Sequence, residues 1–215
     1  MAAHSGAKLG ETFVLRTYPY KEADLIVSFF TRDEGKLRGI ARRARKPKSA
    51  FGAGLERMSH VRMAYFQREN ADLANLTSCE MISSPFDLGS DYDRSLALDF
   101  MTEAAEHLLP AHEPNEKFFR LMIAVVAYLK SGGSVWAAVL YFSLWAVRLS
   151  GVFPEMRVRA ESAEIAHEML EKPLSALTAR EWTKTTASDL RRALVRTMEQ
   201  HVERKFLTVP LLEAL

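Results

Sequence analysis

Hydrophobic and polar positions follow two different periods along this chain. Between residues 11 and 80, strand-length runs rich in Val, Ile, Phe, Tyr and Thr are separated by turn residues. Five runs predict β-strands, over residues 12–17, 24–31, 36–43, 57–67 and 73–81. Residues 46–54 contain Pro, Ser and two Gly, which favour a loop. Five short strands within about 70 residues are typical of a small closed barrel, and five is the strand number of an OB-fold.

Beyond Ser83-Ser84-Pro85 the apolar period becomes that of an α-helix. The spacing predicts long helices over residues 92–109, 115–130, 134–150 and 188–206, and short ones over 162–170 and 173–177. Candidate N-caps are Asp91, Ser134 and Ser188, and Gly151 is a candidate C-terminal stop. The second and third helices are apolar on most faces, which predicts that they lie at the centre of a bundle.

The two periods predict an α+β chain of two domains. Residues 1–82 would form the five-stranded OB-fold barrel and residues 83–215 the α-helical bundle. The apolar stretches 121–129 and 135–149 are too short to span a bilayer, and the N-terminus lacks the apolar core of a secretory signal. We therefore expect a cytoplasmic protein without a membrane partner.

The basic segment, residues 36–48 (KLRGIARRARKPK), is the most unusual feature of the composition. It has no acidic residue, whereas the whole chain carries a net charge of only +2. Residues 1–80 hold 14 basic and 9 acidic groups, so the positive charge belongs to the predicted barrel. A local concentration of this kind predicts an anionic ligand, and on a β scaffold it indicates a phosphate backbone. Its cations are Lys36, Arg38, Arg42, Arg43, Arg45, Lys46 and Lys48.

Alternation along the predicted third strand would place Lys36, Arg38 and Arg42 on one face. The opposite face would carry the small apolar residues Leu37, Gly39 and Ala41, with the aliphatic stem of Arg43 at its end. The competing interpretation is a solvated edge strand that is charged to prevent aggregation. Seven like charges exceed what edge protection needs, so we favour nucleic acid.

Aromatic side chains add base stacking in many barrels that bind single strands. The candidates are Phe51, Tyr65 and Phe66. Tyr65 and Phe66 are adjacent, so one would face inward and the other outward, and core packing is the better interpretation for either alone. Phe51 lies in the Gly-rich loop, and we expect its ring to be exposed and to belong to the DNA site.

Two stretches then show a specific resemblance. Val14 to Val27 follows the pattern V-L-R-T-x-x-Y-x-E-A-D-L-I-V, and Thr31 to Arg45 follows T-R-x-x-G-K-L-x-G-I-A-R-x-A-R. Together with the ending R-L-S-G-V-F-P-E-M of the third helix, up to Met156, they resemble the RecO family of bacterial recombination mediators. The match covers about residues 11–156 and the last helix, and it is most specific in the first 55 residues.

The resemblance implies a DNA repair and homologous recombination mediator of the RecF pathway. Such a protein binds single- and double-stranded DNA, anneals complementary strands and helps to load the RecA recombinase. The implied partners are RecR, in some lineages RecF, and the C-terminal tail of the single-strand binding protein. The implied location is the nucleoid in the bacterial cytoplasm.

The chain departs from the family at its zinc module. Where two CxxC pairs would follow Met156, the sequence is RVRAESAEIAHEM, and Cys79 is the only cysteine of the chain. We expect a shortened remnant at about residues 156–172 that holds no metal. A single ExxH pattern, Glu164 to His167, is half of a di-iron signature and is better explained by an exposed helix.

Other catalytic signatures are also missing from the sequence. There is no P-loop, no complete Rossmann turn and no nucleophile elbow, so we expect a protein that is not an enzyme and needs no cofactor. In the helical region, aromatic residues and nearby cations could form a groove for an acidic peptide tail. Its candidate residues are Lys117, Phe119, Arg120 and Lys130. The alternative function is an adaptor whose basic segment binds an acidic protein.

Overall fold

The computed structural model describes residues 6–68, 71–152 and 157–215. The chain divides into two compact units. The first, the barrel unit, comprises Met1–Pro85 together with Leu109–Glu116. The second, the helical unit, comprises Phe86–Leu108 and Lys117–Leu215. Each unit is described by itself.

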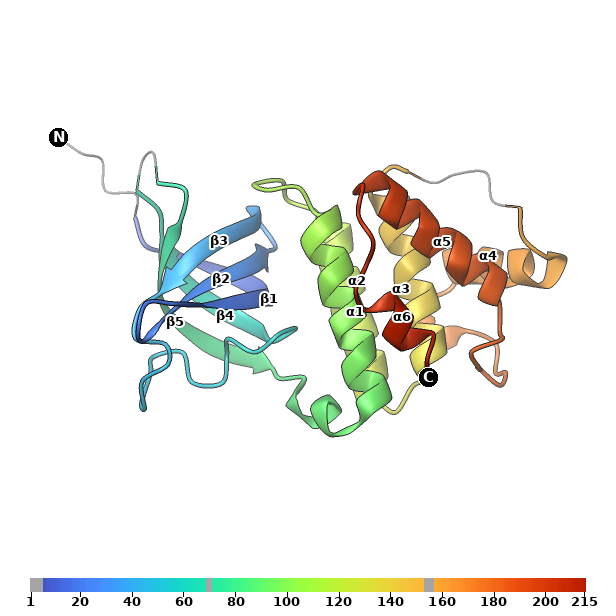
Figure 1. The fold of residues 1–215 in the computed structure, drawn as a ribbon, viewed down its shortest axis with the longest axis horizontal. Helices are drawn as coiled ribbons and strands as arrows, with labels where there is room; N and C mark the ends of the chain where they lie inside the picture. Colours follow the sequence, from blue (N-terminus) through green and yellow to red (C-terminus); the bar gives the residue numbers. More distant parts are fainter. Residues whose placement is uncertain (1–5, 69–70, 153–156) are drawn as a thin grey trace. The chain divides into compact units, whose positions relative to one another are not determined.

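Five strands of the barrel unit close into a barrel in the order β1-β2-β3-β5-β4 (Figure 1). All neighbouring pairs are antiparallel except β3 and β5, which run parallel. The prediction of a five-stranded barrel is confirmed, although β1 is longer at both ends than the pattern indicated. The strands are β1 (Lys8–Tyr20), β2 (Asp24–Thr31), β3 (Gly35–Ala41), β4 (His60–Phe66) and β5 (Ala74–Ser83).

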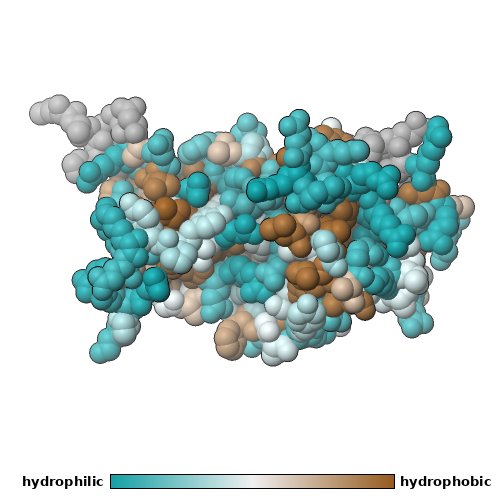
Figure 2. Space-filling view, viewed as in Figure 1, coloured by the Kyte–Doolittle hydropathy of each residue, from teal (hydrophilic) through white to brown (hydrophobic). Residues whose placement is uncertain are grey.

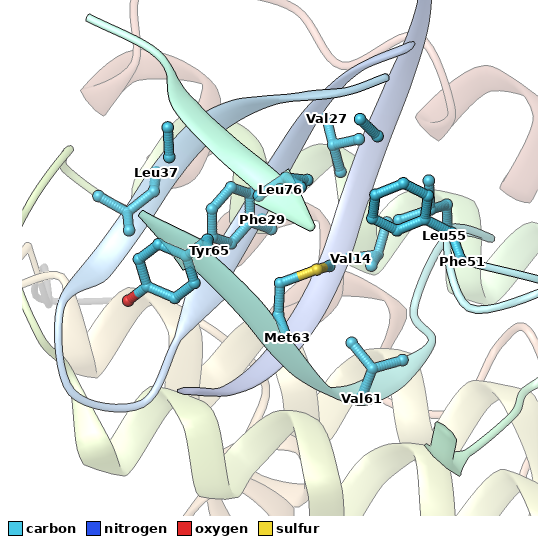
Figure 3. Packing of buried hydrophobic residues seen from close by; sticks show 12 residues of the cluster. Val14, Val27, Phe29, Leu37, Phe51, Leu55, Val61, Met63, Tyr65 and Leu76 are labelled. Atoms are coloured by element: carbon cyan, nitrogen blue, oxygen red, sulfur yellow. The ribbon is translucent and has the colours of Figure 1, made fainter. Parts of the chain in front are cut away.

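Residues of all five strands fill the interior of the barrel (Figure 3). Val14 of β1, Phe29 of β2 and Leu37 of β3 lie opposite one another in the register and are all buried. Met63 of β4 and Leu76 of β5 complete the same core. The period of two that the sequence shows is therefore the alternation between this core and the outside of the barrel.

The segment Leu109–Glu116 completes the edge of β3. On β3, strand β5 pairs only with Gly39–Ala41, and next to the beginning of β3 Ala111 forms a parallel bridge with Lys36. The amide of His112 donates a hydrogen bond of 3.0 Å to the Lys36 carbonyl. Gly35 has φ +76°, and a Cβ at this position would lie 2.3 Å from the Glu113 carbonyl oxygen. Glycine is thus required both by the turn and by this close approach.

The helical unit places α3 at its centre, where it contacts α1, α4 and α5. Its buried face carries large apolar side chains such as Phe142, which meets Phe100 and Phe118 edge-on. The bundle that the 3.6-residue period predicted is confirmed. Its elements are η1 (Phe86–Ser90), α1 (Tyr92–Leu108), α2 (Glu116–Lys130), α3 (Val135–Leu149), α4 (Ala160–Glu171), η2 (Leu174–Ala176), α5 (Ser188–His201) and α6 (Val209–Leu212).

Most helix ends differ from the prediction by one or two residues, and α5 differs more. The N-cap of α5 is Ala187, with φ 47°, and Ser188 is the first helical residue. The same helix ends at His201 rather than at residue 206, and the short α6 follows. Asp91 does cap α1, since its carboxylate accepts a hydrogen bond of 3.1 Å from the Arg94 amide.

Helix α4 occupies most of residues 156–172, the stretch that we expect to be shortened relative to the family's zinc module. Met156 lies outside the described residues, and the rest of the expected remnant, from Arg157 onward, leads into α4. Ile165 and Met169 are buried, and the Met169 carbonyl accepts a hydrogen bond of 3.1 Å from the Trp145 indole. The remnant is therefore an ordinary amphipathic helix packed on α3. No helix among the described residues is long and apolar enough to cross a membrane.

Candidate nucleic-acid interface

The first part of the basic segment lies on β3 with the predicted alternation. Leu37 and Ala41 are buried in the barrel core, and Gly39 between them is buried as well. Lys36 is half-buried and Arg38 is exposed on the opposite face. The strand therefore places these two cations on the outside of the barrel, while the residues that alternate with them pack in its interior.

The second part of the basic segment is a turn rather than strand. β3 ends at Ala41, so the predicted continuation to residue 43 is wrong. Arg43 has φ 57° and an exposed side chain, so its aliphatic stem does not face the core as predicted. The left-handed backbone there reverses the chain, and the Lys46 amide donates to the Arg43 carbonyl at 3.0 Å.

This turn is held against the turn that joins β1 to β2. The Arg43 amide donates to the Asp24 carboxylate at 2.8 Å, and the Arg45 amide donates to the Ala23 carbonyl at 3.0 Å. The Asp24 carboxylate is thus engaged by a backbone amide. Because these hydrogen bonds fix the backbone of the turn, the basic side chains extend from fixed backbone positions.

Six of the seven cations are exposed, and only Lys36 is half-buried. Within residues 6–68, 71–152 and 157–215, none of these six forms a salt bridge with a carboxylate. Hydrophilic side chains cover the loop that follows β3 in the space-filling view (Figure 2). A surface of uncompensated cations attracts polyanions and releases their counterions on binding.

The expected exposure of Phe51 is wrong. Its side chain is 4 % exposed and packs in the barrel core beside Leu55 and Val14 (Figure 3). The Phe51 carbonyl accepts hydrogen bonds from the Gly54 amide at 2.9 Å and from the Cys79 thiol at 3.2 Å. A buried ring cannot stack on a base, so Phe51 leaves the candidate site.

The loop after β3 closes one end of the barrel, which explains the error. Phe51, Leu55 and Met58 are all buried, and they recur at intervals of four and three residues. That spacing was visible in the sequence, but the Gly, Pro and Ser content of the loop obscured it. The apolar side chains of this loop therefore close the end of the barrel, and its charged side chains lie on the outer surface.

The side chains of Tyr65 and Phe66 face opposite sides of β4, as predicted. Tyr65 is 2 % exposed and meets Phe29 edge-on at 5.6 Å between ring centroids. Its hydroxyl donates to the Glu34 carboxylate at 3.0 Å, and burial together with that carboxylate raises the pKa of the phenol. Phe66 is half-buried. Core packing is confirmed for Tyr65.

A β-bulge in β1 brings further residues onto the outer face beside the basic segment. The register of β1 against β2 shifts between Val14 and Arg16. Beyond the shift, Arg16 lies opposite Ser28, which in turn lies opposite Arg38. Tyr18 follows on the same face, and the Arg38 guanidinium lies 5.7 Å from its ring centroid. The sequence pattern does not reveal these β1 residues, because a bulge has no clear signal in the period of two.

The predicted partner groove on α2 loses its aromatic residue. Lys117, Arg120 and Lys130 are exposed, but Phe119 is fully buried in the helical unit. The ring lies on the buried face of α2, next to Phe118 and Met122, and it offers no surface to a peptide. Phe119 therefore has to be removed from the proposed groove.

Cys79 and the candidate metal ligands lie apart from the basic surface in their chemistry. Burial raises the pKa of the Cys79 thiol, which disfavours the reactive thiolate. In the part of the chain that the structure describes, no three His, Cys, Asp or Glu side chains are grouped so that they could hold a metal ion. The described surface that remains as a candidate site is the basic one.

Comparisons with known proteins agree with this picture. Residues 9–85 match the family model for the N-terminal part of recombination protein O, and residues 89–166 match the model for its C-terminal part. The chain is 38% identical to the DNA repair protein RecO of Koribacter versatilis, over 97% of this chain and 99% of that protein. Their alignment extends over 242 residues, so the relative has residues without a counterpart in this chain.

More distant relatives are matched over part of their length. The DNA repair protein RecO of Syntrophus aciditrophicus is 30% identical over 68% of this chain and 56% of that protein. That of a Nocardioides strain is 32% identical over 78% of this chain and 70% of that protein. The chain thus spans just over half the length of the Syntrophus relative. With both family models and a relative of nearly full coverage in agreement, this chain belongs to the RecO family of DNA repair proteins.

Proposed function

We propose that this protein is a non-enzymatic recombination mediator that binds single- and double-stranded DNA and anneals complementary strands. The observation that carries the proposal is the group of six exposed cations on and after β3, without carboxylate partners in the described chain. Two strands repel each other through their phosphates, and a cationic surface lowers that repulsion while base pairing supplies the free energy. No nucleotide hydrolysis is needed for such a reaction.

The same proposal extends to protein partners. In this role the protein would act at the nucleoid in the bacterial cytoplasm, together with RecR and possibly RecF, on DNA covered by the single-strand binding protein. It would help RecA to replace that protein. Exposed cations on α2, namely Lys117 and Arg120, support an acidic peptide tail as a ligand of the helical unit.

Strand annealing tests the proposal. A triple variant R42A/R43A/R45A should anneal complementary oligonucleotides at least about tenfold more slowly than the wild type at low salt, because three phosphate contacts are lost. The matched control is R192A/R196A/R204A, which removes three exposed arginines from the helical unit and should anneal normally. Thermal unfolding would verify that both variants are folded.

Two outcomes would contradict the proposal. Equal annealing by the wild type and the R42A/R43A/R45A variant would refute the site. Absence of DNA binding by the wild type at low salt would refute the function and favour the adaptor, whose basic segment binds an acidic protein instead.

A further inference from the structure

The outer face of β1, β2 and β3 carries a row of apolar side chains beside the basic segment. Tyr18 lies opposite Ile26, and Ile26 lies opposite Ile40, so the three side chains form one row across the strands. All three are half-buried. These side chains are partly accessible to solvent, although the core of this barrel lies on the opposite face of the strands.

Cations border this row on both sides. The row before it consists of Arg16, Ser28 and Arg38, as the register of the strands shows. On the other side, β3 continues into the turn at Arg42, whose side chain is exposed. Asp24 lies opposite Tyr20 on this side, and its carboxylate accepts a hydrogen bond from the Arg43 amide. An apolar strip between cations is complementary to a single strand, because its bases are apolar on their faces and its phosphates are anionic.

Two tyrosines supply flat surfaces at this place. Tyr20, at the end of β1, is 36% exposed, and the Lys21 ammonium lies 5.3 Å from its ring centroid. The Arg38 guanidinium lies at a similar position over Tyr18, at 5.7 Å. Each ring is therefore paired with a cation, and a planar guanidinium next to a ring extends the surface on which a base can stack.

We propose that Tyr18 and Tyr20 stack on unpaired bases and give the barrel a preference for single strands over duplex DNA, while the neighbouring arginines bind the phosphates. This inference rests on the proposed DNA-binding function. Phosphate contacts alone carry no information on whether the bases are paired. Base stacking on a tyrosine requires an unpaired base, so these two side chains would distinguish a single strand from a duplex.

The test compares an oligothymidylate with an abasic oligonucleotide of the same length, which has the phosphates but no bases. The wild-type protein should bind the oligothymidylate at least about tenfold more tightly, since each stacked base contributes substantially to affinity. The variant Y18L/Y20L should bind both about equally, and Y18F/Y20F should restore the difference. Y92L, on α1, is the control because Tyr92 is 67% exposed in the helical unit.

Equal binding of both oligonucleotides by the wild type would overturn the inference and leave the proposed function intact. Failure to bind either would refute the proposed function itself. If Y18L/Y20L does not fold, the single variant Y20L decides the matter, because a substitution at this exposed strand end is tolerated more easily. A Y20L variant that binds oligothymidylate like the wild type would also contradict the inference for Tyr20.

Discussion

Phe51 illustrates how a loop residue can belong to the core. Its ring fills the end of the barrel together with Leu55, although the loop around it has the composition of an exposed turn. The polar positions of the loop face outward and carry the charge, whereas its few apolar positions face inward. The composition of such a loop suggests that all of it is exposed. Only the spacing of its apolar residues indicates that they pack into the end of the barrel.

Replacing Phe51 with Ala should lower the free energy of unfolding by about 3–5 kcal/mol, because the change leaves a cavity in the barrel core. Urea unfolding would measure it. The control is F86A, since Phe86 is 71% exposed and its truncation should cost far less. Under conditions where F51A is still folded, its affinity for single-stranded DNA should equal that of the wild type. A variant of unchanged stability that binds DNA poorly would contradict the assignment of Phe51 to the core.

Glu103 is the second residue whose environment leads to a prediction. Its carboxylate is 2 % exposed and accepts hydrogen bonds from the Leu207 amide at 2.8 Å, the Thr208 amide at 2.9 Å and the Thr208 hydroxyl at 2.7 Å. Burial by itself would raise the pKa of this carboxyl, but the hydrogen bonds outweigh it and the pKa is lowered. The charged form is therefore the one that the fold stabilises.

At the scale of elements, Glu103 joins the segment before α6 to α1. Since the folded state lowers the pKa of Glu103, its contribution is fully present above the ordinary value of 4.5 and is lost as the pH falls through the folded value. The variant E103Q should reduce the free energy of unfolding by about 2–3 kcal/mol at pH 7, because a charged hydrogen-bond acceptor is lost. The difference between wild type and variant should shrink at pH values below 4.

Denaturant unfolding at pH 7 and at acidic pH would measure both effects. A matched control is E171Q on α4, since the Glu171 side chain is 61% exposed and its pairing with His167 lies at the surface. A difference between E103Q and wild type that stays constant from pH 7 to acid would show that the charge of Glu103 is not what anchors the segment.

Elements with a clear period were predictable from the sequence, and those defined by tertiary contacts were not. β2 matches its predicted bounds, because alternation and turn residues coincide at both of its ends. The pairing of Ala111 with Lys36 has no local signal, since it depends on an edge of β3 that β5 leaves open. α5 ends at His201 because the backbone becomes left-handed at Glu203, with φ 51°, and the Arg204 amide donates to the Glu199 carbonyl at 3.0 Å.

The sequence also predicted only part of the candidate site, namely its cations. The cations of the basic segment could be identified because charge density is a property of the sequence itself. Whether an aromatic side chain near them is buried depends on the fold, so Phe51 was placed outside and Tyr18 was overlooked. The bulge between Val14 and Arg16 decides the direction of the side chains that follow it in β1.

For the whole molecule, the distribution of charge matters more than its sum. A net charge of +2 would give little long-range attraction to DNA, yet the basic segment concentrates seven cations within residues 36–48. Their field acts within about 10 Å at 0.1 M salt, which is the range of a bound strand. DNA binding should therefore be strong at low salt and should weaken steeply as salt is added.

The salt dependence of single-strand binding tests the central claim most directly. With six exposed cations on phosphates, a plot of log K against log salt concentration should have a slope of about −4 for the wild type, and the loss of three in R42A/R43A/R45A should bring it to about −2. The variant R192A/R196A/R204A should keep the wild-type slope. Equal slopes for the wild type and R42A/R43A/R45A would show that the basic segment does not bind the phosphates, and would contradict this account.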